Sequence, residues 1–139
     1  MIRFESDYTE GAIPEILRAL EEHNFVQTGG YGVEAVSDAA RARVRELCAA
    51  PDAQVHFLVG GTQTNLTVLA SALRPHQGAV CADAGHIAVH ESGAIEATGH
   101  KVLPVISPDG KLHEESLDAV CAAHWADANH EHTVQPGLA

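Results

Sequence analysis

The 139-residue chain has few basic and few aromatic side chains. Lysine and arginine together number eight against nineteen acidic residues, so the formal net charge at pH 7 is −11. A nucleic-acid backbone or an anionic membrane is bound through clustered Lys and Arg, so this balance argues against either as a partner. Aromatic residues make up only 4% of the chain. We therefore expect a core built from aliphatic side chains and alanine.

The chain also lacks a disulfide pattern and long apolar runs. Cys48, Cys81 and Cys121 are odd in number and widely spaced, which favours reduced thiols. Each stands next to alanine or valine, so we expect all three to be small buried residues. The amino-terminal stretch MIRFESDY has no signal-peptide core, and no segment approaches transmembrane length. The sequence therefore predicts a cytoplasmic protein.

Short β-rich segments alternate with segments of helical periodicity along the chain. We expect helices at residues 13–23, around Val44 and Leu47, and at 62–73, 87–92 and 114–123, and strands at 55–59, 79–82 and 101–105. This alternation is typical of an α/β fold with a mostly parallel sheet and flanking helices. Residues 125–139 have a polar, loop-like composition without a closing strand. We therefore expect one domain over residues 1–124 and a polar tail over 125–139, where a longer chain is cut.

The stretch HFLVGGTQTNL places Gly60 and Gly61 between an expected strand and an expected helix. In parallel sheets, ligands bind where strands end and helices begin. Glycine lets a ligand approach the backbone closely, the helix N-terminus attracts negative charge, and Thr62 and Thr64 add hydroxyl donors. The stretch matches neither a dinucleotide fingerprint nor a P-loop. It favours an anion site, with a capped helix after a tight turn as the alternative.

Four motifs, taken in order, resemble the amino-terminal part of the threonine aldolase family. They are FESDYTEGAIPEIL, QTGGYG, FLVGGTQTNL and DAGHIAVHESGAIEATGHK. This family belongs to the β-eliminating lyases, which use pyridoxal 5'-phosphate (PLP) and have the aspartate-aminotransferase-like fold of type I. The resemblance implies the amino-terminal part of that large α/β domain, an amino acid substrate, and a homodimer or homotetramer with active sites at subunit interfaces.

The resemblance also implies roles for the glycine corner. Gly61 and Thr62 match the family's corner that holds the cofactor phosphate, with Gly60 and Thr64 as neighbours. Many family members have Ser or Thr where Gly60 stands, which implies one hydroxyl contact fewer in this chain.

Four further residues match positions of the family's active site. His86 matches the histidine that lies flat over the cofactor ring, a role that suits a planar imidazole whose nitrogens can bind substrate or water. Glu91 matches a carboxylate near the substrate hydroxyl, and either Glu91 or His86 could be the catalytic base. Ser6 matches a residue that binds the substrate carboxylate. Tyr31 matches an aromatic residue that is usually contributed across a subunit interface.

The implied reaction is aldol cleavage of a β-hydroxy amino acid, such as threonine or allo-threonine, to glycine and an aldehyde. In the family a lysine holds the cofactor. The only lysines here, Lys101 and Lys111, do not stand in a similar lysine motif. We therefore expect this chain to be the amino-terminal portion of a longer enzyme and to be inactive alone.

Other interpretations stay open. A different β-eliminating lyase activity, or a non-catalytic module of the same fold, fits the same motifs. A zinc site is conceivable at His86, His90 and Glu91 with ligands from residues 130–132, but the spacing is not His-Glu-x-x-His, and ten histidines produce such clusters by chance.

The remaining basic residues carry no assigned role. We expect Arg41, Arg43 and Arg45 to face solvent and His100 and Lys101 to form a solvated strand entrance.

Overall fold

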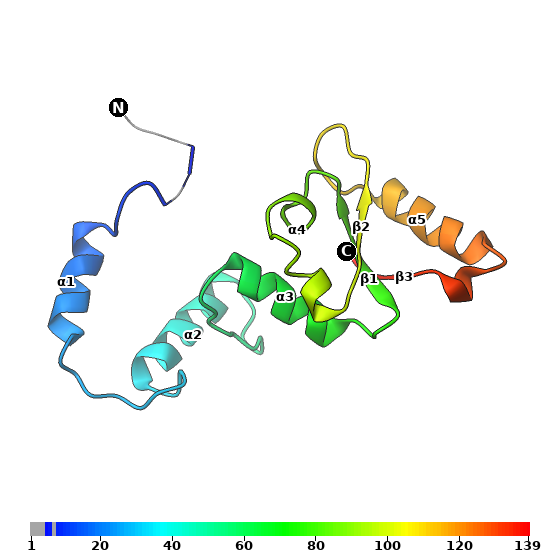
Figure 1. The fold of residues 1–139 in the computed structure, drawn as a ribbon. Helices are drawn as coiled ribbons and strands as arrows, with labels where there is room; N and C mark the ends of the chain where they lie inside the picture. The colour runs from blue at the N-terminus through cyan, green and yellow to red at the C-terminus, as the bar shows by residue number, and fades with distance from the viewer. Residues whose placement is uncertain (1–4, 7) are drawn as a thin grey trace. The chain divides into compact units, whose positions relative to one another are not determined.

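The structure is a computed structural model that describes residues 5, 6 and 8–139. Residues 1–4 and Asp7 lie outside the described residues, and two of them, Phe4 and Asp7, belong to the first of the four motifs. The chain divides into two compact units, Met1–Phe57 and Leu58–Ala139, and Figure 1 traces both of them in chain order. Each unit is described by itself.

The first unit contains α1 (Pro14–His23) and α2 (Ala35–Leu47). The predicted first helix is confirmed, and its ends follow from local chemistry. Pro14 occupies the first turn, where its missing N–H costs no hydrogen bond, and the His23 ring reaches back to the Ala19 carbonyl oxygen at 2.8 Å. No residue of either helix is buried. Their apolar side chains are therefore available for packing beyond the unit.

Arg41 connects several segments of the first unit. Its guanidinium donates to Asp38 Oδ1 at 2.8 Å, to the Gly32 carbonyl at 2.5 Å and to the Val55 carbonyl at 3.3 Å. It also lies 5.7 Å from the ring centre of Phe57. The expectation that Arg41 faces solvent is therefore wrong, because its planar guanidinium donates hydrogen bonds that connect the loops at Gly32 and Val55 to α2.

The second unit is built on a parallel sheet of three strands in the order β2-β1-β3. The central strand β1 (Gln77–Ala82) pairs with β2 (Val102–Val105), with Ala79 opposite Val102. These strands confirm the expected α/β fold and the expected strands at 79–82 and 101–105.

The third strand, β3 (Gln135–Leu138), corrects the expectation of a tail without a strand. It pairs with the other edge of β1, with Gln77 opposite Gln135 and an irregularity after Gly78. Four residues that include Pro136 and Gly137 carry no strand pattern of their own. Their conformation comes from pairing with β1, and an edge position tolerates the proline.

The strand expected at residues 55–59 is wrong. This segment has no strand conformation and pairs with no strand among the described residues. The side chains of Phe57 and Val59 are exposed by 52% and 91%. The Val59 N–H donates to Gln63 Oε1 at 2.9 Å instead of to a sheet. β-propensity alone does not make a strand, because a strand needs a neighbour to pair with.

Helices cover both faces of this sheet, as Figure 1 shows for α4 and α5. On one face lie α3 (Gly61–Ala72), α4 (His86–Val89) and the turn η1 (Glu96–Thr98). This face holds an aliphatic core made by Leu69, Leu73, Ala79, Cys81, Ile95 and Val102. On the other face, Val80 and residues of α5 (Glu114–Ala126) line one cavity. The alternation of Ala79 and Val80 between faces is the period of two of a strand.

Two expectations about burial are wrong. Cys81 is buried as expected, but Cys48 and Cys121 are exposed. Burial, with a smaller contribution from the Asp83 carboxylate, raises the pKa of the Cys81 thiol. His100 does not form a solvated entrance, because only 7% of it is exposed and its Nδ1 lies 3.1 Å from the Gln77 carbonyl oxygen.

Gly78 is required by close packing within the sheet. A Cβ at this position would lie 2.5 Å from the Lys101 carbonyl oxygen and 2.9 Å from Val134 Cγ1. At Gly61, by contrast, a Cβ would meet nothing within 4 Å.

We expect Gly78→Ala to lower the free energy of unfolding by about 1–3 kcal/mol, because backbone atoms must shift to admit the methyl group. Gly61→Ala, the matched control, should change it by less than about 0.5 kcal/mol. Urea denaturation followed by circular dichroism measures both. Equal losses in the two variants would contradict the packing argument.

Candidate functional site

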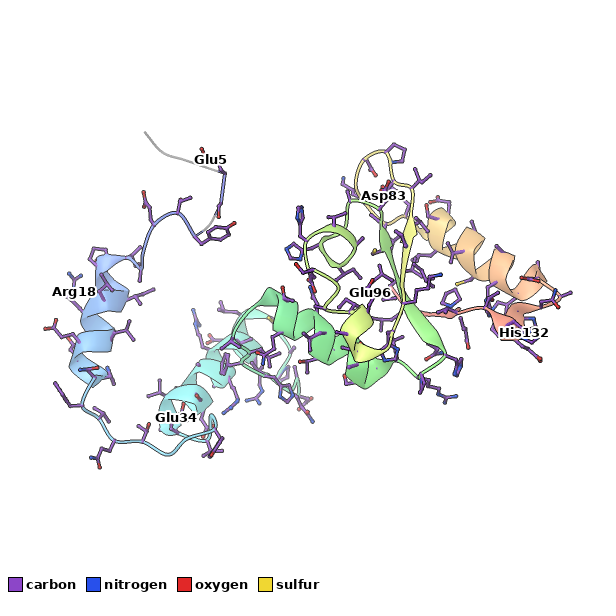
Figure 2. All side chains as sticks on the ribbon, in the orientation of Figure 1. Glu5, Arg18, Glu34, Asp83, Glu96 and His132 are labelled. Atoms are coloured by element: carbon purple, nitrogen blue, oxygen red, sulfur yellow. The ribbon has the colours of Figure 1, made fainter. Side chains whose placement is uncertain are left out.

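The carboxyl ends of β1 and β2 are joined by the side chain of Asp83. Its Oδ1 accepts hydrogen bonds from the backbone N–H groups of Ala84 and Ser107, both at 3.1 Å. Figure 2 labels Asp83 at this end of the sheet. The turn after β1 also needs Gly85, because a Cβ there would lie 2.8 Å from the Ala82 carbonyl oxygen. This tight turn starts α4 at His86, only four residues after the central strand ends at Ala82, on the edge of the sheet where parallel sheets bind ligands.

His86 is held by a buried carboxylate. Its Nδ1 lies 2.8 Å from Glu91 Oε1. The His86 side chain is 61% exposed, whereas that of Glu91 is completely buried. After α4 the chain turns back through Ser92 and Gly93, which both have positive φ angles. The structure therefore brings together His86 and Glu91, the two residues that the sequence suggested as catalytic.

Asn65 of α3 completes this cluster. Its Nδ2 donates to the same oxygen, Glu91 Oε1, at 2.5 Å. The second oxygen, Oε2, is buried and has no hydrogen-bond partner among the described residues. No role was predicted for Asn65 from the sequence, although this residue lies within the FLVGGTQTNL motif. A signal was present in its spacing, because residues three apart share a helix face and Asn65 follows Thr62 by three.

The cluster determines which imidazole nitrogen is free. An amide Nδ2 can only donate, and an ionised carboxylate can only accept, so Glu91 Oε1 is the acceptor of both bonds. In the neutral ring the proton is then on His86 Nδ1, and the lone pair is on Nε2. His86 thus offers solvent an exposed ring with an acceptor nitrogen at Nε2.

The glycine corner forms the start of α3. Gly60 is the N-cap residue in an extended conformation, and no side chain caps the helix. The first N–H groups of a helix have no intrahelical acceptor, so those of Gly61 and Thr62 can bind an anion. The expected hydroxyl donor at Thr64 is not free, because Thr64 Oγ1 donates to the Gly60 carbonyl oxygen at 2.9 Å. Of the two expected hydroxyl donors, Thr62 is therefore the one that fits the corner.

Packing does not explain the glycines at positions 60 and 61. A Cβ at either would meet nothing within 4 Å, and Gly60 has a φ of −176°, which any residue adopts. Gly78 and Gly85, in contrast, are required by nearby backbone atoms. The open space and the uncapped N–H groups of the corner fit a phosphate that approaches from outside the chain. The Asn65–Glu91 bond connects His86 with the same helix.

Ser6 and Tyr31 lie in the first unit, and their assigned roles stay predictions. Ser6 Oγ accepts the Tyr8 N–H at 3.2 Å within a local turn. Tyr31 is fully exposed and has a φ of 67°, which is strained for a bulky residue. Arg41 anchors the next residue, Gly32, so the loop holds the phenol out into solvent.

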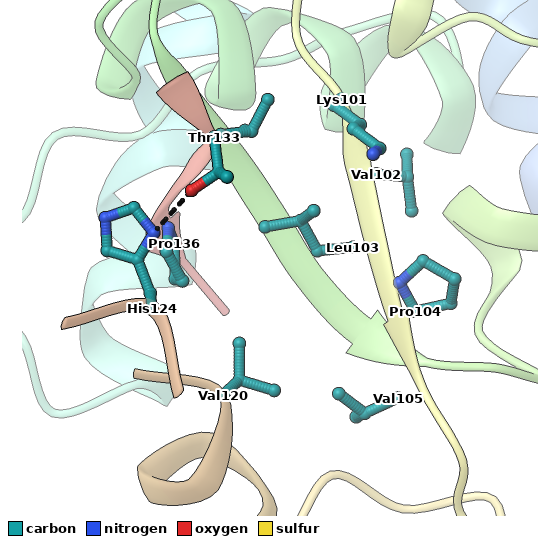
Figure 3. A pocket seen from close by; sticks show the side chains of 10 residues that line it. Lys101, Val102, Leu103, Pro104, Val105, Val120, His124, Thr133 and Pro136 are labelled. Carbon is teal, nitrogen blue, oxygen red and sulfur yellow. Dashed lines mark hydrogen bonds between the residues drawn. The ribbon is translucent and has the colours of Figure 1, made fainter. Parts of the chain in front are cut away.

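Five cavities formed by described residues contain none of the predicted site residues. Figure 3 shows a pocket of about 360 Å³ between β2, β3 and α5, lined mostly by apolar side chains. At its rim Thr133 Oγ1 and His124 Nδ1 lie 3.2 Å apart.

In the part of the chain that the structure describes, no three His, Cys, Asp or Glu side chains gather closely enough to hold a metal ion. Nor does any described helix have the length and apolar character needed to cross a bilayer.

Comparison with known proteins shows the family to which this chain belongs. A family model described as beta-eliminating lyase matches residues 4–135. A solved structure of the threonine aldolase of Leishmania major is 44% identical in sequence, with a TM-score of 0.86. The match covers 94% of this chain and 37% of that chain, so the present chain spans little more than a third of the enzyme's length. No curated protein sequence matches the chain.

We expect His86→Ala to lower the free energy of unfolding by about 1–3 kcal/mol, because Glu91 loses one of its two hydrogen-bond donors. His90→Ala is the matched control: His90 is exposed, and its ring lies 5.6 Å from that of His86. This variant should stay within about 0.5 kcal/mol of the parent protein. Chemical denaturation of the parent protein and the two variants measures these free energies of unfolding. An equal loss of stability in both variants would show that the buried Glu91 carboxylate does not need the hydrogen bond from His86.

Proposed function

Because the chain belongs to the beta-eliminating lyase family, we propose that this protein cleaves a β-hydroxy amino acid of the threonine type into glycine and an aldehyde with the help of PLP. The identity to a threonine aldolase supports this choice of reaction. The observation that carries it is the exposed imidazole of His86 on the buried carboxylate of Glu91, connected through Asn65 to the helix that begins at the glycine corner.

The residues of the second unit fit PLP. The N–H groups of Gly61 and Thr62 and the Thr62 hydroxyl would hold the phosphate, and the open space beside Gly60 and Gly61 gives it access. The exposed ring of His86 would pack against the pyridine ring. When bound, PLP supplies an electron sink for the electron pair released as the Cα–Cβ bond breaks.

His86, rather than Glu91, is the proposed catalytic base. Glu91 is shut off from solvent, whereas more than half of the His86 side chain is exposed. With its proton on Nδ1, the ring can accept the proton of the substrate hydroxyl at Nε2. The adjacent carboxylate then stabilises the imidazolium and keeps the ring in position, as the buried aspartate does in a Ser-His-Asp triad. Glu91 acts in this scheme as a positioning residue.

Ser6 and Tyr31 are proposed to contribute to the substrate side of the site. The Ser6 hydroxyl is a short polar group suited to a carboxylate, and the strained, exposed side chain of Tyr31 suits an aromatic contact across a subunit interface.

Incubation of the protein made from its native gene with PLP and threonine or allo-threonine should yield glycine and acetaldehyde in equal amounts. Amino acid analysis and an aldehyde assay with alcohol dehydrogenase measure the two products. A second lyase activity, supported by the family match, would instead release ammonia and a keto acid. Formation of ammonia and a keto acid without glycine would show that the protein catalyses β-elimination and not aldol cleavage.

We expect Gly61→Ala to weaken binding of pyridoxine 5'-phosphate at least tenfold, which corresponds to about 1.4 kcal/mol. The added methyl group occupies the space through which the phosphate reaches the backbone N–H groups. This probe lacks the aldehyde, so calorimetry reports the phosphate and ring contacts alone. Gly11→Ala, at another glycine with nothing within 4 Å, is the control and should bind as the parent does. Unchanged affinity in Gly61→Ala would mean that the phosphate binds elsewhere.

A further inference from the structure

We propose that Asn65 is a positioning residue that sets the tautomer of His86 by holding the carboxylate of Glu91. The inference rests on the proposed function in one respect, since it is the free Nε2 of His86 that would take the substrate proton. The observation behind it is a single oxygen, Glu91 Oε1, shared by two donors at 2.5 Å from Asn65 and 2.8 Å from His86.

The donor from Asn65 matters because Glu91 has so few partners. Its side chain is fully buried, and Oε2 has no hydrogen-bond partner among the described residues. Burying an ionised carboxylate is costly unless donors compensate it. The amide of Asn65 supplies a donor that carries no charge and no transferable proton. It therefore holds the carboxylate in place and leaves the site's charge unchanged.

Loss of this donor has a specific chemical consequence. With this donor removed, nothing from α3 holds Glu91 Oε1 against His86 Nδ1, and the hydrogen bond that fixes the ring proton on Nδ1 is weakened. The imidazole would then carry its proton on Nε2 instead. In that tautomer His86 lacks the Nε2 lone pair with which it accepts a proton. A change of tautomer, rather than a loss of structure, is thus the signature of the proposed role.

Asn65 is placed for this role by a rigid element. It lies in the middle of α3, between the glycine corner and Leu69, which is buried in the core of the sheet. Thr62 and Asn65 share one face of this helix. Helix α3 therefore carries the proposed phosphate contact at Thr62. Through the bond from Asn65 to Glu91, the same helix also influences which nitrogen of His86 is protonated.

The test compares Asn65→Leu with Thr67→Leu in the protein made from its native gene. Leucine has nearly the shape of asparagine but no donor, and Thr67 is an exposed position on the same helix. Nitrogen-15 NMR of the protein labelled at histidine reports which ring nitrogen is protonated, and the His86 signals are assigned by their absence in His86→Gln. We expect the parent and Thr67→Leu to show Nδ1–H and Asn65→Leu to show predominantly Nε2–H.

Kinetics provide the second readout. Asn65→Leu should lower kcat for aldol cleavage about tenfold to hundredfold, the range seen when the outer partner of a metal-ligating histidine is removed. Its affinity for pyridoxine 5'-phosphate should stay within about twofold of the parent, because the corner is intact. If Asn65→Leu does not fold, Asn65→Met replaces it, since the flexible methionine side chain adapts to gaps.

The outcomes separate this inference from the proposed function. A change to Nε2–H in the Asn65 variant but not in Thr67→Leu supports the role of Asn65, even if the protein turns out to catalyse another lyase reaction. Retention of Nδ1–H in the folded Asn65 variant overturns it, whatever happens to turnover. Aldol cleavage itself is judged only by the products of the parent protein.

Discussion

A carboxylate that is shut off from water must find its hydrogen-bond donors inside the protein, and Glu91 takes both of its donors on one oxygen. One donor comes from α3 and the other from the start of α4, so the carboxylate connects the two elements on the core side of the sheet. The exposed His86 ring depends on this connection for its orientation. The other features of the site, including the glycine corner and the tight turn at Gly85, determine where this pair is presented.

The glycines of the second unit belong to two physical classes, and the distinction separates folding from binding. Gly78, Gly85 and Gly137 lie against other atoms of the chain, where a Cβ would come within 2.9 Å of a neighbour. Gly60 and Gly61 face open space. The first class is explained by the fold alone. Packing does not require the second class, and this observation supports the proposed phosphate site at the start of α3.

Local patterns in the sequence predicted the features that depend on local chemistry. The helices at 14–23 and 61–72, the central strand and the glycine corner all follow from spacing and motif within a few residues. Features that depend on distant partners were missed. β3 forms because it pairs with β1. The segment at 55–59 stays irregular because no described strand pairs with it. Arg41 and Asn65 act through contacts with segments far along the chain.

The strand order has a consequence for the way the protein is made. β1 lies at the centre of the sheet, but both of its neighbours come later in the chain, and β3 is formed by residues 135–138. While the ribosome is still translating residues 83–134, at least one edge of this strand, whose residues are mostly buried in the folded unit, is open to pairing with other nascent chains. The speed of translation over this stretch, at about 5–20 residues per second, therefore sets how long the newborn protein is vulnerable to aggregation.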